Sequence, residues 1–172
     1  MASNVEIKAR VSDWDRVCAR AEALAGPAVE ILEQEDTFFE APHGRLKLRQ
    51  LRPDHGELIL YHRADQAGPK VSSYLLSVTP DPMGLRAVLG EALGVRGVVR
   101  KRRILHRYGR TRIHLDEVEG LGRFLELEVM LRPDEPSTAG SAEAEELMRE
   151  LGVARAELIS GAYLDLMLAA GT

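Results

Sequence analysis

The sequence predicts an α+β fold: an eight-stranded, antiparallel, closed β-barrel with a charged lumen and with helices packed on its outside. Short segments that alternate charged and apolar residues recur along the chain, and each is typical of a strand with one charged and one apolar face. Most of these segments are joined by hairpin-length turns, which favours antiparallel pairing. Their charged faces consist almost entirely of Arg, Lys, Glu and Asp, whereas solvated faces also contain Ser, Thr, Asn and Gln. A closed wall around a water-filled, ionic lumen explains this composition, although one charged face taken alone is typical of ordinary solvated surface.

Length and composition indicate a single domain, expected to span residues 1–172, whose mass of 19.0 kDa is enough for a hydrophobic core. The 23 Lys and Arg against 27 Asp and Glu argue against a nucleic-acid partner, which would need a basic surface. The single cysteine, Cys18, excludes an internal disulfide and is predicted to be a small core residue. No apolar run approaches the ~18 residues of a membrane span, and no signal peptide is evident. We therefore expect a soluble, cytoplasmic monomer or homodimer with no membrane partner.

The first half of the chain alternates strands with two helices. Strands are predicted at 4–11, 29–39, 45–51, 57–63 and 72–78. A helix is predicted from Ser12, whose spacing from Asp15 matches a capping box, and it ends at Gly26-Pro27. A second helix is predicted to begin after Asp81-Pro82, because an N-capping Asp precedes a proline at the first helical position, and to run to about residue 93.

The second half carries the most strongly charged strands. A basic strand is predicted at 98–108, a hairpin at 110–131 that turns at 119–122, a linker at 133–141, and helices at 143–151 and 157–168. In the basic strand Lys101 and Arg103 share one face. Arg100 and Arg102 take the other face, where we expect them to be solvated. The charged face of the hairpin is made of Arg110, Arg112, His114, Asp116, Glu126 and Glu128.

The predicted lumen places acids on one wall and bases on the other. The acids are Glu6, Asp116, Glu126 and Glu128. The bases are Lys8, Arg45, Lys47, Arg49, Arg63, Lys101, Arg103 and Arg112. Carboxylate oxygens suit Mg²⁺ or Mn²⁺, and a cationic wall matches a chain of phosphoryl groups. A divalent metal with a polyphosphate satisfies both walls, but a network of internal salt bridges without a ligand fits the spacing equally well.

Spaced motifs along the chain are similar to those of a known family. They are Val5-Glu6-Ile7-Lys8, Gly44 to Arg49, Gly68-Pro69-Lys70, Arg100 to Arg103, Thr111 to Asp116, Gly122 to Val129 and Gly161 to Leu166. In this order, from about residue 4 to 168, they resemble the CYTH family of triphosphate tunnel enzymes. That family includes class IV adenylyl cyclases, thiamine triphosphatases and inorganic triphosphatases. The likeness is closest to the cyclase-like branch, in the Gly-Pro-Lys loop and in the hairpin from His114 to Gly122.

The resemblance implies a tunnel that binds a small-molecule triphosphate (ATP, thiamine triphosphate or tripolyphosphate) with Mg²⁺ or Mn²⁺. It implies catalytic roles for Glu6, Lys8, Glu126 and Glu128, and metal-side positions for Glu6, Asp116, Glu126 and Glu128. The implied phosphate-side positions are Lys8, Lys47, Arg49, Arg63, Lys101, Arg103 and Arg112, with Arg45 added by strand parity and Lys70 by its place in the family's mobile loop. The family signature Glu-x-Glu-x-Lys aligns with Asn4, Glu6 and Lys8, so one carboxylate of the metal set is missing.

Two functions remain open at this point. The leading one is a metal-dependent enzyme acting on the phosphate chain. In a hydrolase, water aligned by Glu6, Glu126 or Glu128 attacks the terminal phosphorus; in a cyclase, the ribose 3′-hydroxyl attacks the α-phosphorus and pyrophosphate leaves. The alternative is a non-catalytic tunnel that binds a polyphosphate or nucleotide and lost turnover with the first acid, at Asn4. His114 is in phase with the site and is predicted to hydrogen-bond Asp116 rather than to act as a base.

Overall fold

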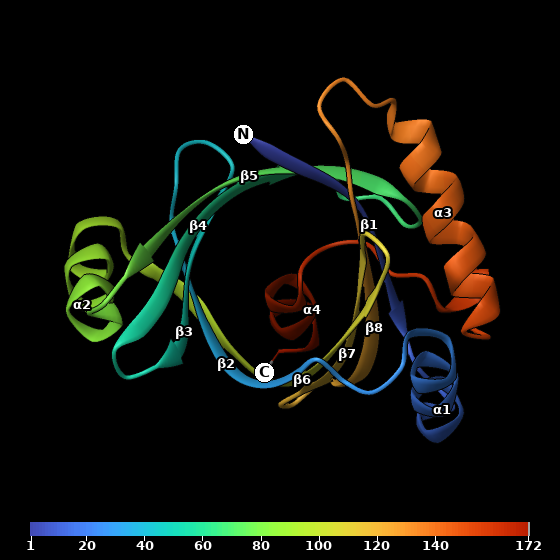
Figure 1. Cartoon of the computed structure of the whole chain (residues 1–172). Coiled ribbons are helices and arrows are strands. Elements are labelled where there is room, and N and C mark those ends of the chain that lie inside the picture. Colours follow the sequence, from blue (N-terminus) through green and yellow to red (C-terminus); the bar gives the residue numbers. More distant parts are fainter. Residues whose placement is uncertain (172) are drawn as a thin grey trace.

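The computed structural model describes residues 1–171 and shows a closed barrel of eight strands (Figure 1). Around the wall the strands follow the order β1-β5-β4-β3-β2-β6-β7-β8, and each neighbouring pair is antiparallel. The strands are β1 (Ala2–Arg10), β2 (Glu30–Phe39), β3 (Arg45–Arg52), β4 (His55–Arg63), β5 (Lys70–Thr79), β6 (Val95–Tyr108), β7 (Thr111–Val118) and β8 (Gly122–Met130). The predicted fold class is confirmed, and closure gives every strand two neighbours.

Helices lie on two sides of the barrel and over its interior. Within residues 1–171 they are α1 (Trp14–Ala25), α2 (Pro82–Leu93), α3 (Ser137–Glu150) and α4 (Tyr163–Ala170), with a short 3₁₀ turn at Arg155–Glu157. In Figure 1, α1 and α3 flank one side of the barrel, α2 flanks the other, and α4 lies within the outline of the ring. None of the helices in this described part of the chain has the length and apolar character needed to cross a membrane.

The predicted start of two helices differs from the structure. Asp13, not Ser12, caps α1: its carboxylate accepts a hydrogen bond from the backbone N–H of Arg16 at 3.3 Å. The Ser12 hydroxyl instead donates to Glu157 at 2.6 Å. The helix predicted at 143–151 already begins at Ser137, so much of the expected linker is helical. The cap predicted at Asp81 is confirmed.

The predicted closing helix at 157–168 is wrong in its first half. There the chain runs beside β1, and the N–H of Ile159 donates to the carbonyl of Lys8 at 3.0 Å. Pairing with β1 satisfies a backbone group that a helix would have to satisfy internally. The helix α4 therefore begins only at Tyr163, and it brings this side chain to the end of the barrel.

Two apolar clusters explain why the charged faces point inward. The outer cluster lies between the barrel wall and helices α1 and α3; its strand members include Val5, Ile7, Ile113, Leu115, Leu125, Leu127 and Val129. Cys18 packs against it, as predicted for a core residue. Burying each such side chain stabilises the fold by roughly 1.5–3 kcal/mol. Because these residues alternate with the charged ones, packing their side outward under helices turns the ionic side into the barrel.

The second cluster closes one end of the barrel beneath α4. It consists of Phe38, Ile59, Tyr61, Val99, Val118, Phe124, Tyr163 and Leu164. Gly97 is required here, because a Cβ at this position would lie 2.5 Å from the Cδ1 atom of Leu164. The close approach seats α4 over the interior, so the tunnel is walled by strands and covered at one end by this helix.

Candidate functional site

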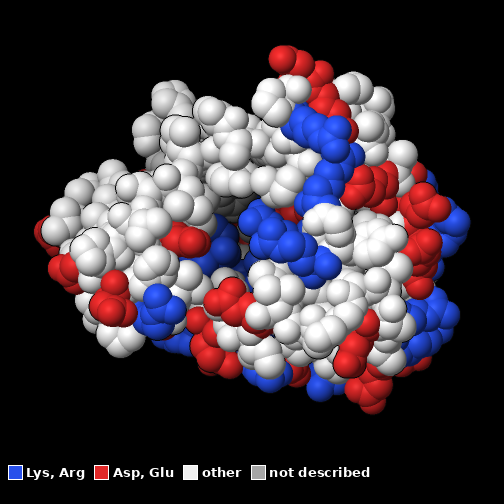
Figure 2. Space-filling model, in the orientation of Figure 1, with Lys and Arg blue, Asp and Glu red and all other residues white. Residues whose placement is uncertain are grey.

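The inner face of the barrel surrounds a cavity of about 210 Å³ that is lined by all eight strands and by α4. Figure 2 shows Lys and Arg side chains gathered around a hollow in the middle of one face of the molecule. The predicted site residues that line the cavity are Glu6, Lys8, Lys47, Arg49, Arg63, Lys101, Arg103, Arg112, Glu126 and Glu128. Alternation along the strands therefore brought these residues to one space. Arg45, Lys70 and Asp116 do not line it.

One buried carboxylate holds three of the cations, in what we call the basic cluster (Asp36, Lys47, Arg49 and Lys101). Arg49 donates to both oxygens of Asp36 at 2.8 and 2.9 Å. Lys47 Nζ lies 3.0 Å and Lys101 Nζ 3.5 Å from its Oδ2 atom. Burial alone would raise the pKa of Asp36, but Arg49, Lys101 and Lys47 outweigh it and hold the pKa well below its usual range. With three cations on one anion, the cluster carries excess positive charge.

Asp36 is a site residue that the sequence analysis missed. It lies in β2 within the run Glu33-Gln34-Glu35-Asp36, where every residue is polar and no inward face stands out. Its parity matches Phe38, and an apolar residue in phase with it gave no sign in the sequence that this face lies toward the lumen. Asp36 is 2% exposed, whereas Glu35 pairs with Arg86 and Arg100 on the outer side.

Asp116, predicted as a metal ligand, is instead engaged by protein groups. Arg103 donates to its two oxygens at 2.7 and 2.6 Å, and the hydroxyl of Tyr163 donates to Oδ2 at 2.9 Å. Asp116 has no exposed surface. Burial would raise its pKa, but Arg103 and then Lys101 lower it. The carboxylate therefore lies behind Arg103, which also contacts Glu126.

The remaining acids form what we call the acid wall (Glu6, Glu126 and Glu128). Each is ion-paired: Glu126 Oε1 with Lys8 Nζ at 2.8 Å, Glu128 Oε2 with Arg112 at 2.6 Å, and Glu6 with Arg63. Burial alone would raise the pKa of Glu126, but the charges of Lys8 and Arg103 outweigh it and hold the pKa well below its usual range. Near pH 7 Glu126 therefore offers ionised oxygens to the cavity.

His114 faces the acid wall and not Asp116, so its predicted pairing with Asp116 is not observed. Its Nδ1 atom lies 3.9 Å from Glu126 Oε2 and 3.8 Å from Glu128 Oε1. Burial, and then the charge of Arg103, lower the pKa of His114, so the imidazole is neutral near pH 7. Within residues 1–171, one ligand atom from each of His114, Glu126 and Glu128 lie within 4.8 Å of one another, close enough to hold one metal ion.

Several polar atoms around the cavity have no hydrogen-bond partner among the described residues. They include Asn4 Oδ1, Arg63 Nε and Nη2, and Arg112 Nε. Burial, followed by the charges of Arg103 and Arg49, outweighs Asp36 and lowers the pKa of Lys101 to about 7. Guanidinium N–H groups that make no hydrogen bond within residues 1–171 leave buried donors without an acceptor, and burial makes Lys101 costly to charge. An anionic ligand would correct this.

A model of the CYTH domain matches residues 2–163 of the chain. This chain belongs to the CYTH family.

Known proteins resemble this CYTH chain over most of its length. It is 24% identical over 175 residues to the Methanocaldococcus jannaschii protein named "Putative adenylate cyclase MJ0240", covering 94% of this chain and 97% of the relative. The structure of the PH1012 protein from Pyrococcus horikoshii OT3 matches with a TM-score of 0.85 and 25% identity, covering 95% of this chain and 98% of that one. The Hippeastrum protein named "Putative adenylyl cyclase HpAC1" and described as having a dominant triphosphatase activity shares the fold. It matches with a TM-score of 0.65 and 20% identity over 98% of this chain and 96% of that one.

Arg45 and Lys70 of this CYTH chain lie at the end of the barrel, outside the cavity lining. Arg45 pairs with Asp65 at 2.9 and 2.6 Å and with Asp165 of α4 at 3.2 Å. Lys70 is the buried first residue of β5, and its Nζ atom donates to the carbonyl of Gln66 at 3.1 Å. Both side chains thus hold the loop at 64–69, whereas the prediction placed Lys70 on that loop.

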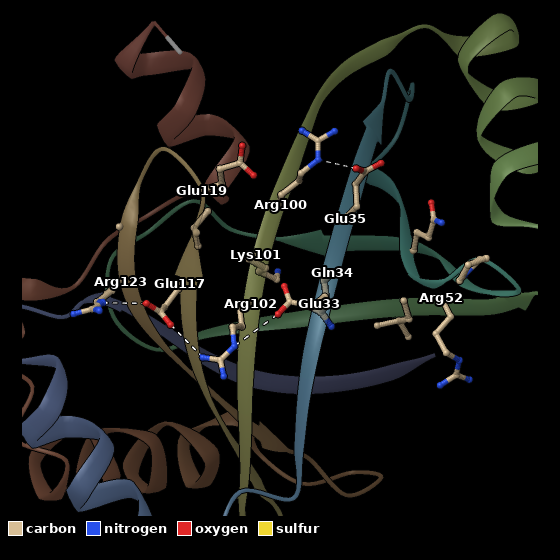
Figure 3. Close-up of a pocket in the computed structure, with 15 residues that line it drawn as sticks. Glu33, Gln34, Glu35, Arg52, Arg100, Lys101, Arg102, Glu117, Glu119 and Arg123 are labelled. Carbon is tan, nitrogen blue, oxygen red and sulfur yellow. Dashed lines mark hydrogen bonds and ion pairs between the residues drawn. The ribbon is translucent and has the colours of Figure 1, made fainter.

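The outward charges of the CYTH barrel pair with one another beside an external groove (Figure 3). The pairs are Arg100–Glu35 at 2.8 Å, Arg102–Glu117 at 3.3 Å, Arg102–Glu33 at 3.7 Å and Arg123–Glu117 at 3.2 Å. Arg110 was predicted on the charged face of the hairpin, but it does not line the cavity and pairs with Glu135 and Glu143. The expectation that Arg100 and Arg102 are solvated is confirmed, since their side chains are 55% and 44% exposed.

Proposed function

We propose that this CYTH protein is a single-domain, divalent-metal-dependent enzyme that hydrolyses a small-molecule triphosphate. One observation carries the proposal: the basic cluster and the acid wall line the same cavity inside the barrel. A triphosphate chain needs several cations at once, and its metal needs carboxylate oxygens beside them. Adenylyl cyclisation is the second candidate reaction, favoured by the name of the Methanocaldococcus relative.

The ion pairs of the lumen support binding of a polyanion. Lys47, Arg49 and Lys101 share the single carboxylate of Asp36, so phosphoryl oxygens would supply the negative charge that this cluster lacks. The unpartnered N–H groups of Arg63 and Arg112 would donate to further oxygens. The same cations would stabilise charge that develops on the phosphoryl group during transfer.

The acid wall fits a divalent metal. Glu126 and Glu128 would hold it, with Glu6 beside them, because ionised carboxylate oxygens are the donors that Mg²⁺ and Mn²⁺ prefer. When bound, such an ion neutralises phosphate charge and orients the phosphate oxygens. Asn4 replaces the first acid of the family signature, and its unpartnered Oδ1 atom offers a neutral oxygen there. A glutamate that is not occupied by the ion would orient the attacking water.

Product analysis tests the proposal. The protein is incubated with ATP, thiamine triphosphate and tripolyphosphate in turn, each with Mg²⁺ or Mn²⁺, and the products are identified. Release of orthophosphate supports hydrolysis, whereas cyclic nucleotide with pyrophosphate would assign the cyclase reaction. Tight binding without either product would contradict an enzyme.

Asn4 is the feature that favours a non-catalytic binder, and restoring the acid tests that alternative. If turnover was lost with the carboxylate, Asn4→Glu gives a large gain in rate with each substrate. If the enzyme uses the remaining acids, the rate of Asn4→Glu stays close to that of the parent protein.

A further inference from the structure

We infer that His114 is a direct ligand of the metal, and that its imidazole makes the site selective for Mn²⁺ and later first-row metals over Mg²⁺. The inference rests on the metal site of the proposed function but does not depend on turnover. It changes the predicted set of metal ligands. The sequence predicts oxygen ligands only, Asp116 among them, whereas in the structure the nitrogen of His114 takes the place of that carboxylate.

The distances from His114 to each of the two glutamates fit a shared ion. Nδ1 lies 3.8 Å from Glu128 Oε1 and 3.9 Å from Glu126 Oε2. Two atoms that bind the same ion at roughly 2.0–2.2 Å can be no more than about 4.4 Å apart. Both separations are within this limit, and both are too long for a hydrogen bond. His114 and the glutamates are thus placed to share an ion.

The Nδ1 atom of His114 also lacks another partner. It is buried, makes no hydrogen bond among the described residues, and belongs to a side chain that is 5% exposed and lines the cavity. Buried ring nitrogens of histidine are normally satisfied by a carbonyl, a carboxylate or water. Here the nearest acceptors stand back by almost 4 Å, and a cation between them would satisfy all three groups.

Around this corner Lys8 holds Oε1 of Glu126 and Arg103 holds its Oε2 atom, so an ion would share Glu126 with these two cations. Arg112 holds Oε2 of Glu128, so Oε1 is the oxygen that faces His114. Asp116 is not part of this group, because it does not line the cavity and its oxygens accept from Arg103 and Tyr163. An imidazole beside two carboxylates is a mixed nitrogen and oxygen set. Imidazole suits the transition metals from Mn²⁺ to Zn²⁺, whereas Mg²⁺ favours oxygen alone.

Pulsed electron paramagnetic resonance on the Mn²⁺-loaded full chain tests the inference, with and without tripolyphosphate. We expect ¹⁴N modulation from a directly bound imidazole, its loss in His114→Asn, and its replacement by a ¹⁵N pattern when only the histidines are labelled. The labelled parent protein gives the answer even if His114→Asn fails to fold. The matched control is His62→Asn, at an exposed position outside the cavity lining, which should keep the parent spectrum.

Titration calorimetry supplies the second readout. His114→Asn keeps an oxygen donor, so the ratio of Mn²⁺ to Mg²⁺ affinity should fall by at least about tenfold while Mg²⁺ affinity changes little. Absent nitrogen coupling, an unchanged ratio, or no Mn²⁺ binding would each overturn the inference, even in a protein that hydrolyses triphosphates. Nitrogen coupling in a protein that turns over no triphosphate would support the ligand and contradict the proposed function instead.

Discussion

The two faces of β6 carry the same kind of side chain into opposite surroundings. Arg100, Lys101, Arg102 and Arg103 are consecutive, and alternation sends the second and fourth into the lumen and the other two outward. The side chains of Lys101 and Arg103 are 3% and 4% exposed, against 55% and 44% for Arg100 and Arg102. In Figure 3, Arg100 and Arg102 point to their outer partners while Lys101 projects away from them. Charge alone therefore does not mark the site; the direction of the side chain in a closed wall does.

This difference in surroundings predicts a difference in energy. Ion pairs on the outer face are surrounded by water and contribute about 0–1 kcal/mol each. Pairs in the lumen have lost most of their hydration, so removing one partner leaves an uncompensated buried charge at a cost of about 3–5 kcal/mol. Matched substitutions on the two faces separate these cases.

The largest effect is expected for Arg103→Ala. The substitution removes the two hydrogen bonds that Arg103 donates to the fully buried Asp116, and it removes the contact of Arg103 with Glu126. It should lower the free energy of unfolding by about 3–5 kcal/mol. Arg102→Ala breaks only exposed pairs and should cost less than about 1 kcal/mol. Urea unfolding monitored by circular dichroism measures both. Equal losses in the two variants would contradict the distinction between the faces.

A large effect on rate is expected at the acid wall. Under the proposed function, Glu128→Gln removes an anionic oxygen at the metal and should lower triphosphate turnover on the order of 10²–10³-fold, roughly 2.7–4 kcal/mol in activation free energy. Glu126→Gln should act in the same direction. Glu117→Gln, on the outer face and paired with Arg102 and Arg123, is the control and should leave turnover within about twofold. Unchanged turnover in Glu128→Gln would remove the metal assignment.

Alternation along the strands was enough to predict most of the lumen. Lys101 and Arg103, or Glu126 and Glu128, are separated by two positions in clearly amphipathic strands, so their common face follows from the pleat. Asp36 could not be assigned in this way, because both faces of its strand are polar at that point. Alternation also cannot predict which carboxylate has its oxygens hydrogen-bonded by neighbouring side chains. Asp116 and Glu126 have the same parity and both pair with Arg103, but Tyr163 also donates to Asp116, which does not line the cavity.

The ends of the barrel were beyond the reach of the sequence pattern. Alternation puts Arg45 on the inner face, and the family resemblance puts Lys70 on a mobile loop, but neither carries information on where the cavity stops along the axis. That limit depends on contacts between distant segments, such as Arg45 with Asp165 of α4. The contacts of His114 were equally out of reach, because the glutamates that face it, Glu126 and Glu128, lie on another strand, β8.

A smaller effect, on affinity, is expected from pH. The pKa of Lys101 is lowered to about 7, and a bound polyphosphate favours its charged form. Binding therefore takes up a proton above pH 7, and affinity for tripolyphosphate should fall as pH rises from 7 to 8.5, by at most about tenfold per unit. Lys101→Met should bind roughly tenfold more weakly at pH 6.5 and show a shallower decline. Arg100→Met should keep the parent slope, since titration of the phosphate itself affects all three proteins equally. Calorimetry at several pH values makes the measurement, and an unaltered slope in Lys101→Met would exclude this lysine as the source.

The smallest of these effects is expected at Tyr163, whose hydroxyl reaches from α4 to the charges of the lumen. Tyr163→Phe removes one hydrogen bond to Asp116 while Arg103 still holds both carboxylate oxygens, so the free energy of unfolding should fall by roughly 1–1.5 kcal/mol. Tyr108→Phe is the matched control at the exposed end of β6, where the side chain is 42% accessible, and it should change stability by no more than a few tenths of a kcal/mol. If the two phenylalanine variants unfold at the same urea concentration, the hydroxyl of Tyr163 does not couple α4 to Asp116. A loss confined to Tyr163→Phe would show that α4 stabilises the inner charges as well as covering the end of the barrel.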